Sequence, residues 1–252
     1  MQKVEWVIFD KDGTIIELDS IWIPWAKNFY LNLTENSDFE VAFSLQHFLT
    51  TIGVTADGTT IDPTSPLAVG SIQEAETIMA YLLYQQQGIA WSEGVMLARA
   101  ASSLATAQQE SITVQELPGI RQLLISLKEH SIRLGVVTAD STARAELHLK
   151  QLGLWSLFEF VLGSDQVTSS KPFPDLAHLA QERYQVSLEQ TVMIGDSNAD
   201  MLFAKNAGML YSIGIIPQDV YPKDYLPDAM KIIEVYDESL ITLLIAKEDQ
   251  HG

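Results

Sequence analysis

The chain has 252 residues, of which 47% are hydrophobic, and its formal net charge is −18 with a pI of about 4.5. This acidic balance argues against binding nucleic acid or anionic lipid through bulk charge, and the absence of cysteine excludes disulfides, thiolate nucleophiles and cysteine-ligated metals. No apolar run approaches the roughly 20 residues of a membrane span, and the N-terminal stretch lacks the long apolar region of a signal peptide. We therefore expect a cytoplasmic protein with neither nucleic acid nor membrane as a partner. The sequence does not indicate an oligomeric state.

The first predicted strand covers residues 4–9, a short apolar run that ends at Asp10. From about residue 18 to 116 the apolar residues recur instead at helical spacing, and no segment there resembles a strand. Residues 53–70 are rich in Gly, Pro and Thr and are predicted to form a loop between helices. The helices predicted in this region cover residues 21–33, 39–50, 72–87 and 92–111.

The rest of the chain alternates short apolar segments with helical patterns. The predicted strands cover 133–138, 158–162, 191–195 and 209–213, and the predicted helices cover 119–130, 141–152, 175–184 and 199–207. This alternation is typical of a parallel sheet covered by helices on both faces. The sequence therefore predicts a doubly wound, Rossmann-like α/β core formed by residues 1–17 and 117–252. An all-helical domain, residues 18–116, is inserted into it.

Polar residues follow three of the predicted strands. The first strand ends at Asp10, the second at Thr138-Ala139-Asp140, and a later one at Gly195-Asp196. Ligands of open parallel sheets bind outside the carboxyl ends of the strands, so these side chains are predicted to share one site. The alternative is that each polar residue only marks the point where a strand meets solvent.

Four segments resemble, in order and spacing, the motifs of the haloacid dehalogenase superfamily. They are DKDGT (10–14), Thr138 after an apolar strand, Lys171 in KPFPD (171–175) and GDSNAD (195–200). The resemblance covers nearly the whole chain, and the helical insertion is similar to the C1-type cap of that superfamily. It implies phosphoryl transfer through an aspartyl-phosphate, with Mg²⁺ as cofactor and a small phosphomonoester as substrate.

The first motif would supply the reacting groups. Asp10 matches the nucleophile of the superfamily, which splits hydrolysis into two easier steps through a covalent acyl-phosphate. Asp12 can protonate the leaving group as a general acid and then activate water as a general base. Gly13 suits a sharp turn of the backbone, and Gly13 and Thr14 are candidates for substrate binding.

Carboxylates that share a pocket with a phosphate dianion would repel it, and a hard divalent cation with oxygen ligands resolves this conflict. The resemblance implies Asp10 and Asp196 as direct carboxylate ligands of Mg²⁺, and the backbone carbonyl of Asp12 as a further ligand. Asp200 is expected to orient the other ligands.

The remaining motifs would bind the phosphoryl group. Lys171 is expected to place a fixed cation opposite Asp10, while Thr138 and the Ala139 N–H group donate hydrogen bonds to phosphoryl oxygens.

Several of these residues have simpler explanations. The alternatives are a solvated loop lysine at position 171, a carboxylate at position 200 that only favours a helix dipole, and an ordinary strand residue at position 138. Asp175 is predicted to cap a helix rather than take part in chemistry, and the DGT sequence within residues 56–60 is predicted to be a turn. No histidine is assigned to the site, because His47, His130, His148, His178 and His251 lack metal-binding spacing.

Asp12 separates possible activities within the superfamily. Haloacid dehalogenases, phosphonatases and P-type ATPases lack an aspartate at this position, whereas phosphatases and hexose phosphomutases have one. A phosphatase is therefore predicted, with a hexose phosphomutase as the alternative. A non-catalytic module phosphorylated on Asp10 stays open as a different class of function. A dinucleotide-binding protein is disfavoured, because no G-x-G-x-x-G follows the first strand.

The inserted domain has an acidic composition. Residues 18–116 contain eleven acidic residues but only two Lys or Arg residues, Lys27 and Arg99. These two are candidates for substrate binding, with His47 as a possible third cation. Because a second phosphate or carboxylate would call for several cations, the preferred substrate is expected to have a neutral or weakly charged leaving group.

Overall fold

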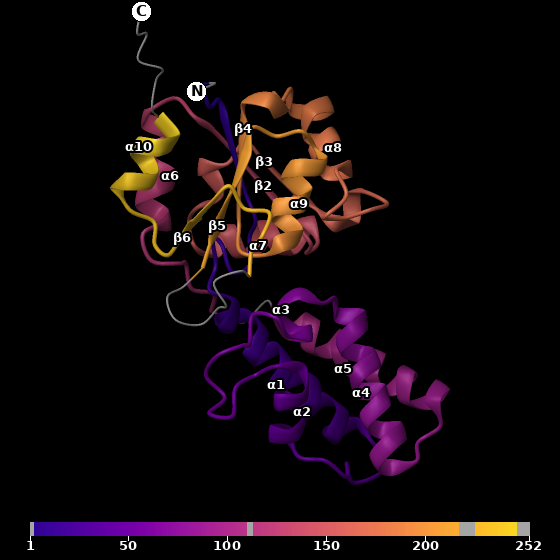
Figure 1. The fold of residues 1–252 in the computed structure, drawn as a ribbon. Coiled ribbons are helices and arrows are strands. Elements are labelled where there is room, and N and C mark those ends of the chain that lie inside the picture. The colour runs from indigo at the N-terminus through magenta and orange to yellow at the C-terminus, as the bar shows by residue number, and fades with distance from the viewer. Residues whose placement is uncertain (1–2, 110–112, 217–224, 246–252) are drawn as a thin grey trace, which may run out of the picture. The chain divides into compact units, whose positions relative to one another are not determined.

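The computed structural model describes residues 3–109, 113–216 and 225–245, and the chain forms two compact units (Figure 1). One unit combines residues 1–17 with 114–252, and the other covers residues 18–113. The first is an α/β unit and the second is built from helices.

The α/β unit is organised around a parallel sheet of six strands in the order β3-β2-β1-β4-β5-β6. The strands are β1 (Trp6–Phe9), β2 (Arg133–Thr138), β3 (Phe160–Gly163), β4 (Thr191–Gly195), β5 (Tyr211–Ile215) and β6 (Lys231–Ile233). The helices are α6 (Ile120–Glu129), α7 (Thr142–Gln151), α8 (Asp175–Tyr184), α9 (Asn198–Asn206) and α10 (Glu238–Ile245). In Figure 1, α6 and α10 lie on one side of the sheet and α8 and α9 on the other. The predicted doubly wound α/β core is confirmed.

Burial of the strands explains their sequence. All four residues of β1 are buried, as are all five of β4, because helices cover both faces of the sheet. Trp6 and Ile8 belong to one core cluster together with side chains of α8 and α9, including Leu176 and Phe203. Continuous apolar runs are therefore required here, rather than the alternating pattern of a half-exposed sheet.

The strand register sets the position of the first motif. Phe9, the last residue of β1, pairs with Val136 on one side and with Ile194 on the other. The Asp10 N–H group donates to the Ile194 carbonyl at 2.9 Å, so β1 and β4 are still adjacent where the polar residues begin. The residues that follow β1, β2 and β4 therefore emerge at the same edge of the sheet.

The helical unit has its own core. Its helices are α1 (Leu18–Asn36), α2 (Leu45–Ile52), α3 (Pro66–Val69), α4 (Ile72–Gln87) and α5 (Trp91–Gln108). Buried aromatic rings lie in contact along it, with Phe29 5.2 Å from Trp25 and 5.5 Å from Phe48 between ring centroids. The start of α4 is fixed by a capping box, in which Ser71 and Glu74 bond to each other's backbone N–H groups. The role of this unit as a cap domain stays a prediction.

Several predicted boundaries shift. The helix expected over 39–50 begins only at Leu45, because Ser44 adopts an extended conformation and caps α2 by accepting from the His47 N–H group. The strands expected over 158–162 and 209–213 are displaced to 160–163 and 211–215, and the loop of 53–70 contains the short helix α3. Residues 110–111 of the helix expected over 92–111 lie outside the described residues.

β6 and α10, which lie beyond the last predicted strand, were not predicted. β6 has only three residues, and its central Ile232 is 40% exposed, so it gives neither a long apolar run nor a regular alternation. The described part of the chain contains no helix of the length and apolar character needed to cross a membrane.

Candidate active site

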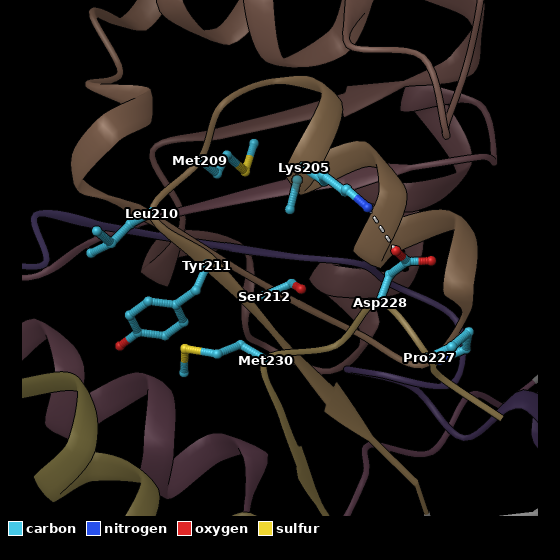
Figure 2. Close-up of a pocket in the computed structure, with 9 residues that line it drawn as sticks. Lys205, Met209, Leu210, Tyr211, Ser212, Pro227, Asp228 and Met230 are labelled. Carbon is cyan, nitrogen blue, oxygen red and sulfur yellow. Dashed lines mark hydrogen bonds and ion pairs between the residues drawn. The ribbon is translucent and has the colours of Figure 1, made fainter. Parts of the chain in front are cut away.

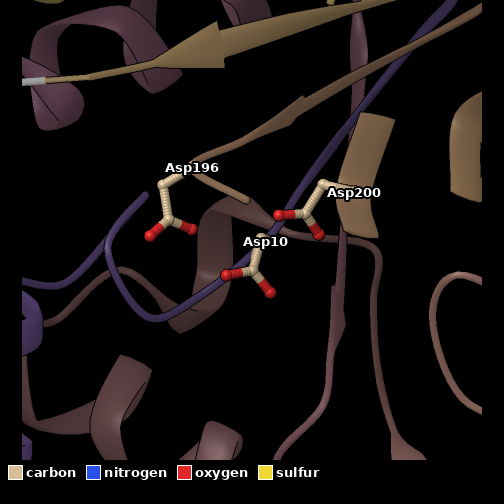
Figure 3. A group of neighbouring side chains, drawn as sticks. All are labelled: Asp10, Asp196 and Asp200. Carbon is tan, nitrogen blue, oxygen red and sulfur yellow. The ribbon is translucent and has the colours of Figure 1, made fainter. Parts of the chain in front are cut away.

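Three carboxylates meet at the edge of the sheet where β1 and β4 end (Figure 3). Asp10 follows β1, Asp196 follows β4, and Asp200 lies in the first turn of α9. Each offers a carboxylate oxygen, and these atoms all lie within 4.8 Å of one another. Residues almost two hundred positions apart are thus brought together, as the comparison of strand ends predicted.

Burial and mutual repulsion perturb this cluster. Burial raises the pKa of Asp10 to about 7, and the neighbouring charges of Asp200 and Asp12 add to the effect, while Lys171 opposes it. Burial also raises the pKa of Asp196 well above its ordinary value, with further contributions from Asp10 and Asp200. Buried carboxyl groups this close favour either a proton or a bound cation. The donor set, oxygen atoms only, fits a hard divalent ion such as Mg²⁺.

Lys171 lies inside the cluster. Its Nζ donates to Asp10 Oδ1 at 2.5 Å and to Asp200 Oδ1 at 2.6 Å, and its side chain is only 5% exposed. Burial would lower the pKa of Lys171, but the attraction of Asp10 and Asp200 outweighs it and raises the pKa above its usual range. The alternative of a solvated loop lysine therefore does not describe this residue.

Asp200 is held from two directions. Its Oδ2 accepts hydrogen bonds from the Ser197 N–H group at 3.1 Å and the Ser197 hydroxyl at 2.6 Å, which completes a capping box at the start of α9. Its Oδ1 binds Lys171. A Cβ atom on Gly195 would lie 2.4 Å from the Asp200 Cβ, so only glycine allows this approach. Both interpretations of Asp200, as a helix-start carboxylate and as part of the cluster, describe its contacts.

Gly13 and Thr14 form the turn beside Asp196. Gly13 has a φ of +75°, and a Cβ atom there would lie 2.0 Å from Asp196 Oδ2. The Thr14 hydroxyl donates to Asp196 Oδ1 at 3.3 Å. The turn is thus shaped around the Asp196 carboxylate.

Thr138 and Ala139 stand at the end of β2. The buried Thr138 hydroxyl accepts a hydrogen bond from the Asp140 N–H group at 3.1 Å. Ala139 is exposed, and its carbonyl accepts from the Ser164 hydroxyl at 2.7 Å. The Thr138 hydroxyl hydrogen is therefore still available for a ligand, because the only bond recorded for this hydroxyl among the described residues is one that it accepts.

The other candidates lie elsewhere. Asp175 is the first residue of α8, and Pro174 occupies the N-cap position, so the predicted Asp175 cap is displaced by one residue. The turn predicted at residues 56–60 is present, with Asp57 Oδ1 accepting from the Thr59 N–H group at 3.2 Å. In the helical unit, Lys27 is partly buried, and the largely exposed Arg99 lies 3.7 Å from Glu76. Substrate binding by Lys27 and Arg99 stays a prediction.

Two further residues, one inside the first motif and one in contact with it, were not assigned to the site from the sequence. Lys11, between the two aspartates, is fully buried and forms an ion pair with Asp12. His148, which was not predicted to belong to the site, lies with Nδ1 3.2 Å from Lys11 Nζ. A lysine within an apolar strand end was the available signal for Lys11, whereas His148 looked like any other helix residue.

Tyr236 was also missed, because it follows the unpredicted strand β6. Its hydroxyl donates to the Thr14 carbonyl at 2.9 Å. Burial, together with the charges of Asp196 and Asp10, raises its pKa well above the ordinary range.

A cavity of about 370 Å³ lies elsewhere in the α/β unit, beside the start of β5 and the end of α9 (Figure 2). Lys205 and Asp228 form an ion pair at its rim, 3.0 Å from Nζ to Oδ1. Tyr211, the first residue of β5, lines it, so it adjoins the amino end of that strand, whereas the three carboxylates follow carboxyl ends.

The fold and the site define a parallel α/β protein with a buried carboxylate cluster and an embedded lysine. Residues 7–213 match the family described as haloacid dehalogenase-like hydrolase. The chain belongs to this family, so the predicted superfamily is confirmed.

Proteins with similar sequences or structures include several named as phosphatases. A solved structure named as a putative beta-phosphoglucomutase from Thermotoga maritima is also similar, with a TM-score of 0.66 at 20% identity, covering 96% of this chain and 98% of that chain. The chain is 41% identical over 98 residues to a probable phosphatase, IndB, of Dickeya dadantii, covering 39% of this chain and 42% of that protein. It is 30% identical over 183 residues to a phosphoglycolate phosphatase of Vibrio cholerae, covering 63% of this chain and 80% of that protein. The crystal structure of a predicted phosphoglycolate phosphatase from Haemophilus somnus superposes with a TM-score of 0.68 at 19% identity, covering 95% of this chain and 98% of that chain. The chain spans about half the length of the first curated relatives, 42% and 55%.

Proposed function

We propose that the protein is a Mg²⁺-dependent phosphatase that hydrolyses a small phosphomonoester through an aspartyl-phosphate on Asp10. The observation that carries this proposal is the position of Asp10, which is buried beside Asp200 and the partly buried Asp196 and is bound by Lys171. A lone buried carboxylate would be neutral, but a neighbouring ammonium group and a bound cation both favour the ionised form that can act as a nucleophile. The relatives named as phosphatases support the same reaction class.

In the first step an Asp10 carboxylate oxygen attacks phosphorus, the bond to the leaving oxygen breaks, and Asp12 gives that oxygen its proton. In the second step Asp12 takes a proton from water, whose oxygen attacks phosphorus and releases phosphate and free Asp10. Lys171 offsets negative charge near the nucleophile throughout. The Thr138 hydroxyl and the Ala139 N–H group bind phosphoryl oxygens, as proposed for oxyanion stabilisation in general.

The metal site would consist of the Asp10 and Asp196 carboxylates and the Asp12 carbonyl, with Asp200 orienting its neighbours. Bound Mg²⁺ would supply positive charge for the phosphoryl oxygens and lower the repulsion among the carboxylates. Gly13 permits the close approach of the turn to Asp196 that such a site needs.

The substrate is proposed to have a neutral or weakly charged leaving group. In the helical unit, Lys27 and Arg99 are the only Lys or Arg residues, and Arg99 already lies near Glu76.

The expected cytoplasmic location also stays a prediction, and cell fractionation would test it.

The test of the proposed function is phosphate release from a broad panel of phosphometabolites with Mg²⁺, for the wild type, Asp10→Asn and Asp175→Asn. Asp10→Asn should lose nearly all activity, because an amide is a poor nucleophile, while Asp175→Asn should keep it. Retention of most activity by Asp10→Asn would contradict the mechanism. A phosphorylated isomer in place of free phosphate would indicate a phosphomutase, and a long-lived phosphoryl group on Asp10 without turnover would indicate a non-catalytic module.

A further inference from the structure

Lys11 is a fully buried charged residue inside the first motif. It lies between the proposed nucleophile Asp10 and the proposed acid–base residue Asp12, and it has no exposed surface. A buried ammonium group is strongly disfavoured unless it is paired and hydrogen-bonded. Its Nζ contacts three groups, namely the Asp12 carboxylate, the Asp140 carboxylate and the His148 ring. These partners fix where the Lys11 side chain points.

His148 acts as a neutral acceptor for Lys11. Its Nδ1 lies 3.2 Å from Lys11 Nζ, and its ring is buried within α7. Burial lowers the pKa of His148 to about 4, and the Lys11 charge contributes in the same direction. The imidazole is therefore neutral near pH 7, and because an ammonium group can only donate, Nδ1 accepts and the ring proton resides on Nε2.

Asp140 connects this contact to the loop after β2. Its Oδ2 lies 3.3 Å from Lys11 Nζ as an ion pair without hydrogen-bond geometry. Its Oδ1 accepts from the Ser141 N–H group at 2.7 Å and lies 2.9 Å from Arg144 Nε. The cluster thus contains two cations, two carboxylates and one neutral ring, so its formal charges balance. It ties the β1 loop to the β2 loop and to α7.

We propose that Lys11, held by His148 and Asp140, is a positioning residue for the proton transfer by Asp12. Lys11 engages Asp12 through Oδ1, which leaves Oδ2 to carry the proton to the leaving oxygen. The Asp12 side chain is only 15% exposed, so its direction depends on the protein groups around it, of which Lys11 is one. This inference rests on the proposed phosphatase function and assigns to the Lys11 cluster a part in its first step.

The inference is tested by leaving-group dependence. General acid catalysis typically contributes 10²–10⁴-fold, and it matters most when the leaving group is poor. We compare kcat/KM for phenyl phosphate and p-nitrophenyl phosphate, which have nearly the same shape, while the nitrophenolate leaves more easily without a proton. Lys11→Met should lower kcat/KM for phenyl phosphate at least about tenfold more than for p-nitrophenyl phosphate, equal to about 1.4 kcal/mol of differential transition-state stabilisation. Asp12→Asn should show the same bias.

Controls separate positioning from general damage. Lys150→Met removes an exposed lysine of the same helix as His148 and should change neither substrate's kcat/KM. His148→Leu should show the same bias as Lys11→Met. His148→Asn should show a smaller bias than His148→Leu, because an amide oxygen can accept in place of Nδ1. The two His148 variants also provide the test if Lys11→Met does not fold.

A chemical rescue restores the ammonium group itself. Because the chain has no cysteine, Lys11→Cys can be alkylated with 2-bromoethylamine under denaturing conditions and refolded, which gives a lysine analogue at this position alone. Recovery of the wild-type ratio between the two substrates supports the inference. Equal losses on both substrates, in folded Lys11→Met or His148→Leu, would overturn it while the proposed function stands. If the wild type hydrolyses neither ester nor any compound of the metabolite panel, the proposed function fails and the inference fails with it.

Discussion

Replacing Asp10 by asparagine should stabilise the metal-free protein while it removes activity. The pKa of Asp10 is raised from 3.8 to about 7, chiefly by burial, so the folded state holds a proton that the unfolded chain has released. Stability from this group is therefore fully present below pH 3.8 and is lost as the pH rises to about 7. The difference between the Asp10 pKa values of the unfolded and folded states corresponds to at most about 4 kcal/mol of stability. An amide resembles the protonated carboxyl group and does not incur this loss.

The measurement is urea unfolding in excess chelator at about pH 5.5 and about pH 8, for the wild type and Asp10→Asn. Lower pH values are avoided because the protein would approach its pI of about 4.5, where low net charge promotes precipitation. About half of the pH window lies between these conditions. The free energy of unfolding of Asp10→Asn, relative to the wild type, should therefore rise by roughly 2 kcal/mol from the lower to the higher pH.

Asp175→Asn is the matched control, because it makes the same chemical change at the first residue of α8. It measures how much of any change with pH comes from an Asp-to-Asn substitution outside the carboxylate cluster. If the Asp10→Asn difference stays within about 0.5 kcal/mol of the Asp175→Asn difference at both pH values, or falls as the pH rises, the argument that Asp10 is destabilised by burial is wrong. Added Mg²⁺ should reverse the order of stability at pH 8, because the ion binds the native carboxylate cluster of the wild type better than that of the variant.

Three further predictions concern the site. Gly13→Ala should abolish activity, while Gly208→Ala should not. Both glycines have positive φ values (+75° and +70°), so each alanine adds a strain of about 1–2 kcal/mol, but only at Gly13 would the new Cβ meet Asp196. Equal activity of the two variants would exclude the contact with Asp196 as the cause. Chelation should remove phosphate release and Mg²⁺ should restore it, while Ca²⁺, which prefers more ligands at longer distances, should inhibit; full activity in excess chelator would rule out the metal site. A neutral sugar phosphate or aryl phosphate should surpass phosphoglycolate and a sugar bisphosphate in kcat/KM, and a preference of more than about tenfold for a multiply anionic substrate would refute the charge argument and direct mutagenesis to Lys27 and Arg99.

The core was predictable because its signals are local and repeated. The apolar segments that became β1, β2 and β4 are continuous, since both faces of the sheet are covered, and each is followed by polar residues. Parallel pairing then requires those polar residues to emerge at one edge, so the meeting of Asp10 with Asp196 follows from topology. In contrast, β6 is too short to produce a pattern, and its place at the end of the sheet depends on pairing with β5.

The contacts around the first motif were not predictable in the same way. Lys171 could be assigned from the motif order, but its simultaneous contact with Asp10 and Asp200 depends on the loop before α8 folding back toward the sheet. His148 lies 137 positions from Lys11 and reaches it only because α7 packs beside the strand ends. Side-chain pairs of this kind carry no periodic signal, and a single sequence offers no means of finding them.

The two buried lysines divide the carboxylates between them. Lys171 binds Asp10 and Asp200, and Lys11 binds Asp12 and Asp140. Asp196 forms no ion pair within the described residues, and its carboxylate accepts a hydrogen bond from the neutral Thr14 hydroxyl.

The charge on Asp196 is therefore the least compensated of the group, which agrees with the strong upward displacement of its pKa by burial and by its acidic neighbours. A divalent cation would supply the missing charge at this position. Asp196 is consequently the carboxylate whose charge should depend most on a bound cation. Gly13 and Thr14 form the turn that lies against it, and the Tyr236 hydroxyl holds that turn by donating to the Thr14 carbonyl.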